Sequence, residues 1–142
     1  MPSTLTKFNA FVENLAEGVH NLQSHTIKAM LTNTAPTAAN ALKSDITEIS
    51  AGNGYTAGGA TITVTSSAQT SGTYKLVLAD ATITAAGGSI GPFRYAVLYN
   101  DTPTSPLKPL IGYLDYGSSI TLLDGEPLTL DFDPSAGALT LA

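Results

Sequence analysis

Short runs of alternating apolar and hydroxyl-bearing residues fill the chain after residue 60 and constrain its fold more than any other feature. ATITVTS, TYKLVLAD and FRYAVLYN are three of these runs. Alternation with a period of two is typical of strands that bury one face, and the Gly, Pro and Asp residues between the runs favour turns. Roughly eight such strands predict a mainly β fold, a β-sandwich or jelly roll, with residues 1–142 as a single domain.

The N-terminal stretch has a different period. Apolar residues recur there at helical spacing and predict one short amphipathic helix over residues 4–17. Ser3 or Thr4 would cap its start, and Gly18 would end it. Such a helix either covers the protein's own sheet or docks on a partner subunit, and both alternatives are open. The candidate partner contacts in the second case are Leu5, Phe8, Phe11 and Val12.

Three stretches between the helix and the β-rich part have their own character. TIKAMLTN (26–33) predicts a strand, and residues 38–49 predict a helical turn or an irregular crossing. GNGYTAGG (52–59) predicts a loop, because its glycines adopt positive φ freely. Further along, Asp124-Gly125 lies between two alternating runs and predicts a β-hairpin.

Composition excludes several classes of function. Charged residues make up only 12% of the chain, against about 25% in a typical soluble domain, and the net charge is −5. Without a cluster of Lys and Arg, we expect no direct binding to nucleic acid. The chain has no cysteine, which excludes disulfides and thiolate chemistry. It has no leader-like segment and no apolar run of about 18–20 residues, so we expect no membrane association and synthesis in a cytoplasm.

Arg94 is the only arginine and stands between Phe93 and Tyr95 in a predicted strand. Its planar guanidinium could clamp an anion. The alternative is a structural charge that pairs with Asp115 or Asp101, or that faces a partner subunit. Because no other basic residue accompanies it, we interpret Arg94 as half of a structural charge pair, with Asp115 as the named partner.

The remaining polar residues match no catalytic pattern. His20 and His25 are five residues apart, which suits neither one helical face nor one strand face, so we expect a surface-loop pair. Asp131 and Asp133 are expected on one exposed strand face that ends at a Pro turn. The glycines of residues 52–59 do not match a dinucleotide-binding or P-loop motif, and no nucleophile elbow is present. We therefore expect no enzymatic activity, no cofactor and no metal.

The order of four segments resembles that in a family of small virion structural proteins of tailed bacteriophages. The segments are KAMLTNTAP, GYTAGG, RYAVLYND and PLIGYLDYG, and the resemblance extends from about Ile27 to Leu141. It implies a non-enzymatic component of the virion, made in the host cytoplasm, on the outer capsid surface or in the tail or neck; our leading hypothesis is a capsid decoration or cement protein. Such a protein bridges and stabilises major capsid protein subunits or contacts other virion proteins, and is a homo-oligomer, dimer or trimer.

Two other functions remain open at this point. One is a tail, neck or baseplate component with an adhesion or receptor-binding role, which exposed aromatic residues at Tyr55, Tyr113 and Tyr116 would favour. The other is a glycan-binding or hydrolytic β-sandwich, which needs carboxylates that converge in a cleft.

Overall fold

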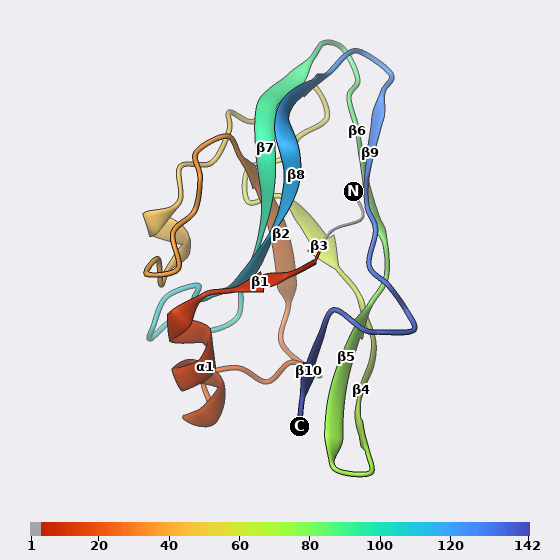
Figure 1. The fold of residues 1–142 in the computed structure, drawn as a ribbon. Coiled ribbons are helices and arrows are strands. Elements are labelled where there is room, and N and C mark those ends of the chain that lie inside the picture. Colours follow the sequence, from red (N-terminus) through yellow and green to blue (C-terminus); the bar gives the residue numbers. More distant parts are fainter. Residues whose placement is uncertain (1–3) are drawn as a thin grey trace.

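Strands form most of the regular structure in residues 4–142, the part of the chain that the structure, a computed structural model, describes (Figure 1). The central sheet has five antiparallel strands in the order β1-β8-β7-β2-β3. These strands are β1 (Thr6–Lys7), β2 (Ile27–Thr32), β3 (Ala60–Ile62), β7 (Ile90–Asn100) and β8 (Leu110–Leu122).

Two smaller antiparallel sheets lie beside the central sheet, with β6 and β9 near one end and β10, β5 and β4 near the other (Figure 1). Their strands are β4 (Val64–Thr70), β5 (Thr73–Leu78), β6 (Ala81–Thr84), β9 (Pro127–Leu130) and β10 (Leu139–Leu141). The predicted mainly β fold is confirmed, and the arrangement is consistent with a β-sandwich that carries a short N-terminal helix.

The larger hydrophobic core fills the space between the central sheet and the smaller ones. It joins side chains such as Leu31 and Leu98 of the central sheet to Leu76 of β5 and Leu130 of β9. A smaller hydrophobic cluster covers the other face of the central sheet. It consists of Phe8, Met30 of β2, Val97 and Tyr99 of β7, and Leu110 of β8. Strands β2 and β7 are therefore buried on both faces, which makes them the rigid centre on which irregular segments can be positioned.

The N-terminal helix is shorter than predicted. Helix α1 spans Asn9–Ala16, and residues 6 and 7 pair instead with Tyr113 and Gly112 at the edge of β8. Gly112 permits this pairing, because a Cβ there would lie 2.8 Å from the carbonyl oxygen of Thr6. Phe8 occupies the N-cap position without a side-chain cap, so the predicted cap at Thr4 is wrong, and Ser3 lies outside the described residues.

Gly18 ends the helix region as predicted. Its φ is +80°, and its N–H donates to the carbonyl of Leu15 while the N–H of Val19 donates to that of Asn14. This pair of hydrogen bonds is a Schellman motif, which favours glycine at the position with positive φ.

Two predictions about the strands are wrong: one predicted strand is two strands, and one predicted hairpin does not form. The run ATITVTS divides at Thr63 into β3 and β4, which belong to different sheets. The Asp124-Gly125 turn forms, but β8 and β9 on either side of it do not pair with each other. The segment that follows β6 binds the turn, since Gly125 N–H donates to Ala85 O and Gly87 N–H donates to Asp124 Oδ1. The chain thus crosses from one sheet to another at this turn.

Candidate functional site

The four apolar candidates for a partner contact lie in three different environments. Phe8 and Phe11 are 1% and 2% exposed and belong to the protein's own core, so they cannot contact a partner while the chain is folded. Leu5 is half-buried and packs against the larger core. Val12 is 58% exposed. Of the two alternatives, covering the protein's own sheet is the one that the phenylalanines adopt, and Val12 alone stays fully available.

Arg94 is paired, and its partner is Asp115. The guanidinium donates two hydrogen bonds to the carboxylate, with Nε to Oδ1 at 2.8 Å and Nη2 to Oδ2 at 3.1 Å. The hydrogen bond from Arg94, and then that from the N–H of Gly117, hold the pKa of Asp115 below its usual value. Asp101 instead pairs with Lys28 and Lys108. The guanidinium fork already faces a carboxylate, which removes the anion-clamp alternative.

The predicted alternation along β7 breaks near this pair. Phe93 shares the larger core with Ala96 and Leu98, although strict alternation would place it on the opposite face. The register with β8 shifts between Phe93 and Tyr95, which is a bulge that changes the direction of the side chains.

Glu48 is the centre of a polar cluster that the sequence did not reveal. Its carboxylate accepts hydrogen bonds from Tyr55 Oη at 2.7 Å, from Gly58 N at 2.6 Å and from Lys43 Nζ at 3.1 Å. Burial raises the pKa of Glu48, but the hydrogen bonds from Tyr55, Gly58 and Lys43 together lower it by more than burial raises it. The pKa therefore lies below its usual value. The carboxylate is therefore ionised and fully partnered at neutral pH.

This Glu48 cluster fastens the 52–59 loop to the central sheet. Tyr55 Oη accepts a hydrogen bond from the backbone N–H of Leu31, and Tyr99 Oη donates to the carbonyl of Gly58. Burial raises the pKa of both tyrosines, so neither hydroxyl loses its proton near neutral pH. A general acid or base needs a pKa near the working pH, and the pKa values of Glu48, Tyr55 and Tyr99 are all shifted away from 7. The geometry of the cluster suits positioning of the backbone.

Gly59 completes the attachment. Its φ is +84°, and a Cβ on it would lie 1.8 Å from the carbonyl oxygen of Ala29 in β2. Only a glycine permits so close an approach of two backbones. The glycine-rich composition that predicts a loop here thus has a second cause, which is contact with the sheet.

The two histidines do not form a surface-loop pair as predicted. His20 is only 6% exposed, and the side-chain nitrogen of the buried Asn100 lies 3.1 Å from His20 Nδ1 and 2.9 Å from His25 Nδ1. Burial, and then the neighbouring His25, lower the pKa of His20 to about 4. This Asn100 cluster could not be predicted from the sequence, because Asn100 lies 75 residues from His25 and 80 from His20.

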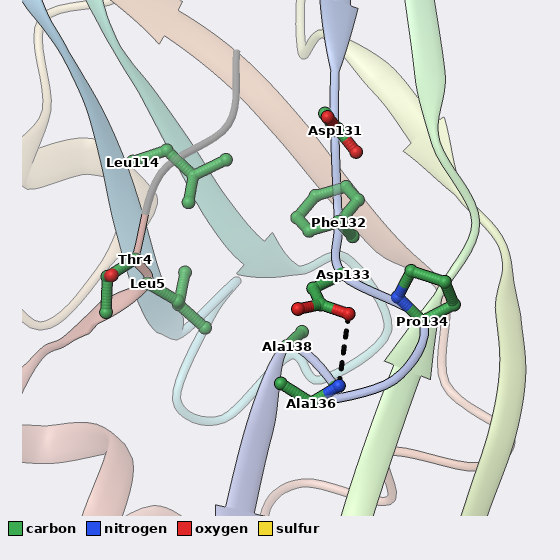
Figure 2. A pocket seen from close by; sticks show the side chains of 10 residues that line it. Thr4, Leu5, Leu114, Asp131, Phe132, Asp133, Pro134, Ala136 and Ala138 are labelled. Carbon is green, nitrogen blue, oxygen red and sulfur yellow. Dashed lines mark hydrogen bonds between the residues drawn. The ribbon is translucent and has the colours of Figure 1, made fainter.

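A cavity of about 660 Å³ lies between the N-terminal stretch and residues 131–138 (Figure 2). Leu5 and Leu114 lie on one side of it, and Phe132 on the other. Asp131 and Asp133 also line it, but β9 ends at Leu130, so the predicted placement on one strand face is wrong.

Asp133 is bound within its own turn. Asp133 accepts hydrogen bonds from the backbone N–H groups of Ala136 and Ser135, which lower its pKa. Glycoside hydrolysis needs one carboxyl group whose pKa is raised so that it can donate a proton. The carboxylate of Asp133 shapes a turn instead.

A second groove, of about 710 Å³, lies between the segment after α1 and strands β4, β5 and β10. Its lining has no charged side chain and includes Leu15, His20, Tyr74 and Leu141. Leu141 is 56% exposed, although it stands in register with Tyr74 on β5. The apolar interior between these layers therefore reaches solvent at this end.

Large exposed apolar side chains are distributed over several elements. Tyr116 is 45% exposed, whereas Tyr113 is half-buried and Tyr55 is buried, so Tyr55 is no part of an exposed aromatic surface. The complete set among the described residues is Val12, Leu107, Tyr116, Leu123 and Leu141.

Within residues 4–142, no three His, Asp or Glu side chains are placed to hold a metal ion together. No helix in that part of the chain has the length and apolar character to cross a membrane. Comparison of the chain with family models, with curated proteins and with solved structures finds no match.

Proposed function

We propose that this chain is a non-enzymatic structural protein of a tailed-bacteriophage virion, and that it acts as a capsid decoration protein that bridges major capsid protein subunits. The observation that carries the proposal is the way in which the four resembling segments meet. KAMLTNTAP supplies β2, RYAVLYND supplies most of β7, and PLIGYLDYG supplies the first part of β8, and these strands are neighbours in the central sheet. The hydrogen bond from Tyr99 to Gly58 adds GYTAGG to the same unit.

The use of polar groups supports the same proposal. The carboxylates of Glu48, Asp115 and Asp133 accept hydrogen bonds that fasten loops, strands or turns. None of these groups combines a raised carboxyl pKa with a cleft, which would suggest a catalytic site. A protein built in this way presents a surface rather than a reaction centre.

The exposed apolar side chains suit contacts in more than one direction. Val12 lies on α1, Leu107 in the loop before β8, and Leu141 on β10. A bridging protein needs at least two contact surfaces, and each surface can be weak because many sites act together. Binding only to the assembled lattice would stabilise it by about 2.7 kcal/mol per site when the free protein is at 100 times its Kd.

Copy number in purified particles tests the proposal. Quantitative mass spectrometry against the major capsid protein should give one copy per capsid subunit or a simple fraction of that ratio. A handful of copies per particle would contradict decoration and support the tail, neck or baseplate alternative. Absence from the particle would contradict both.

A binding experiment with variants locates the contact. Particles that lack the protein are mixed with purified wild type, Val12→Asp or Leu107→Asp, and bound protein is measured after sedimentation. We expect at least one variant to bind several-fold less, since a buried unpaired charge is costly. Thr82→Asp is the matched control, because Thr82 is exposed on β6 and adds the same charge elsewhere. Equal loss in all three variants would indicate general repulsion and not a defined contact.

A further inference from the structure

The Asn100 cluster has a hydrogen-bond pattern that fixes the protonation state of both histidines. The backbone N–H of Asn21 donates to His25 Nδ1, with 3.2 Å between the nitrogens, so this nitrogen carries a lone pair and no proton. The backbone N–H of Thr102 donates to Asn100 Oδ1, which turns the NH₂ group of Asn100 toward the two rings. That NH₂ group has two hydrogens, one for each imidazole Nδ1.

Nδ1 of each ring therefore acts as an acceptor. This places the proton of a neutral His20 on Nε2, which is buried and has no hydrogen-bond partner within residues 4–142. The next proton can bind only at Nδ1, where it would face an N–H of Asn100 instead of an acceptor. Rotating the Asn100 amide would offer its oxygen to the rings but would place NH₂ against the N–H of Thr102. Neither orientation of the Asn100 amide bonds a charged histidine and the Thr102 N–H together, so protonation costs the cluster one of its hydrogen bonds.

No nearby acid offsets a charge on His20 or His25. Among residues 4–142, none of the four ion pairs includes either ring. Asp101 follows Asn100 but is bound by Lys28 of β2 and Lys108 of the next loop. Helix α1 presents the ring of Phe11 to His20, at 5.1 Å between centroids. On the groove side the lining has no charged group.

The cluster lies where an irregular segment, which also places Leu22 in the larger core, meets the sheet. Residues 18–26 contain no helix or strand, and they reach the end of β7 through Asn100 and through two hydrogen bonds of Thr26. His20, Asn21 and Leu22 of the segment also form one wall of the uncharged groove. Loss of the cluster would free this wall while the rest of the sheet stays paired.

We propose that His20, His25 and Asn100 form an acid-sensitive latch, which holds residues 18–26 on the end of β7 at neutral pH and releases them when the histidines are protonated. Release widens the groove between α1 and the β10-β5-β4 sheet. The pKa of His20 supports the direction: it is about 4 in the folded chain against 6.5 for the free side chain, so the open form binds the proton more tightly. The latch is thus complete above about pH 6.5 and weakens as pH falls toward 4.

Amide hydrogen exchange on the full chain tests the latch, with rates divided by the intrinsic rates at each pH. Between about pH 7.5 and about pH 5, the protection of amides in residues 18–26 should fall about 25-fold through His20 alone. The amides of β7 and β8 should keep their protection, which distinguishes local release from global unfolding. Unchanged protection in residues 18–26, or an equal loss throughout the sheet, would overturn the proposal.

Two variants and one spectrum complete the test. His20→Gln keeps an acceptor for Asn100 but does not titrate, so the pH effect should shrink; a loss of protection equal to wild type overturns the proposal. Asn100→Asp offers a carboxylate oxygen to charged rings, so protection should rise on acidification instead of falling. If either variant fails to fold, long-range ¹H–¹⁵N correlation on wild type decides, because a proton on Nδ1 of either ring at about pH 7.5 overturns the assignment.

Discussion

The Glu48 cluster and the Asn100 cluster both hold an irregular segment against the central sheet, but the central group is a charged carboxylate in the first and a neutral amide in the second. Each fastens an irregular segment to β2 or β7 through hydrogen bonds between residues distant in sequence. Glu48 carries a negative charge and receives three donors. The Asn100 cluster has no ionised carboxylate at its centre: a neutral amide contacts both rings, and burial lowers the pKa of His20.

Protons therefore reach the two attachments at different pH. The pKa of Glu48 is lowered on folding, so its contribution to stability is present above the ordinary carboxyl value of 4.5 and is lost as pH falls through its lower folded pKa. The pKa of His20 is also lowered, but from 6.5, so its contribution weakens at milder acidity. On acidification, the Asn100 cluster therefore loses its contribution to stability at a higher pH than the Glu48 cluster does.

Removing the carboxylate at the charged attachment should strongly destabilise the fold. Glu48→Ala leaves Tyr55 Oη, Gly58 N–H and Lys43 without their acceptor, and we expect a loss of about 3 kcal/mol in the free energy of unfolding. Urea denaturation followed by tyrosine fluorescence measures it. Glu13→Ala is the control, because Glu13 is an exposed carboxylate on α1, and it should change stability by less than about 0.5 kcal/mol. Equal losses of stability in the two variants would show that the hydrogen bonds of Glu48 stabilise the fold no more than an exposed carboxylate does.

Substitutions at two glycines of equal φ allow the stability cost of a close backbone contact to be measured apart from the cost of backbone conformation. Gly59 and Gly72 both have φ of +84°, but a Cβ at Gly72 would meet no atom within 4 Å. Gly59→Ala should therefore lose about 2 kcal/mol more than Gly72→Ala, which bears only the conformational cost of about 1–2 kcal/mol. The difference in urea midpoints between the two variants measures this. Equal midpoints would mean that the backbone at Gly59 does not lie in close contact with β2.

Arg94→Ala should have the smallest effect. The pair with Asp115 is partly exposed, with side-chain exposures of 38% and 40%, so water and salt screen it. We expect a urea midpoint that cannot be distinguished from that of wild type, in low and high salt alike. A clear loss of stability would place this pair beside the Glu48 cluster and end the contrast between interior and surface charge.

Local pattern was enough to predict most strands but not their neighbours. TIKAMLTN, TYKLVLAD and FRYAVLYN became β2, β5 and β7, because alternation reflects which residues face a core. The break at Thr63 and the crossing at Asp124-Gly125 depend on which sheet receives each strand, and alternation carries no such information.

The polar clusters were beyond prediction for a related reason. Asn100 contacts histidines that are 75 and 80 residues away. The partners of Glu48 lie within 10 residues, but their spacing matches no motif and depends on how the irregular segment folds. The Arg94–Asp115 pair was predictable because few charges compete for a single arginine, and the two lie on adjacent strands in the structure.

The β4–β5 hairpin projects beyond the rest of the fold in Figure 1, and its turn consists of Ser71 and Gly72, both with positive φ as a type I′ turn requires. Every residue from Ala68 to Thr73 is exposed or only half-buried, and none belongs to either core. An epitope or enzyme tag inserted at this tip would interrupt no core packing. The hairpin is thus a ready attachment point for displaying foreign sequences, and on a multi-copy particle each insertion would be repeated at every copy.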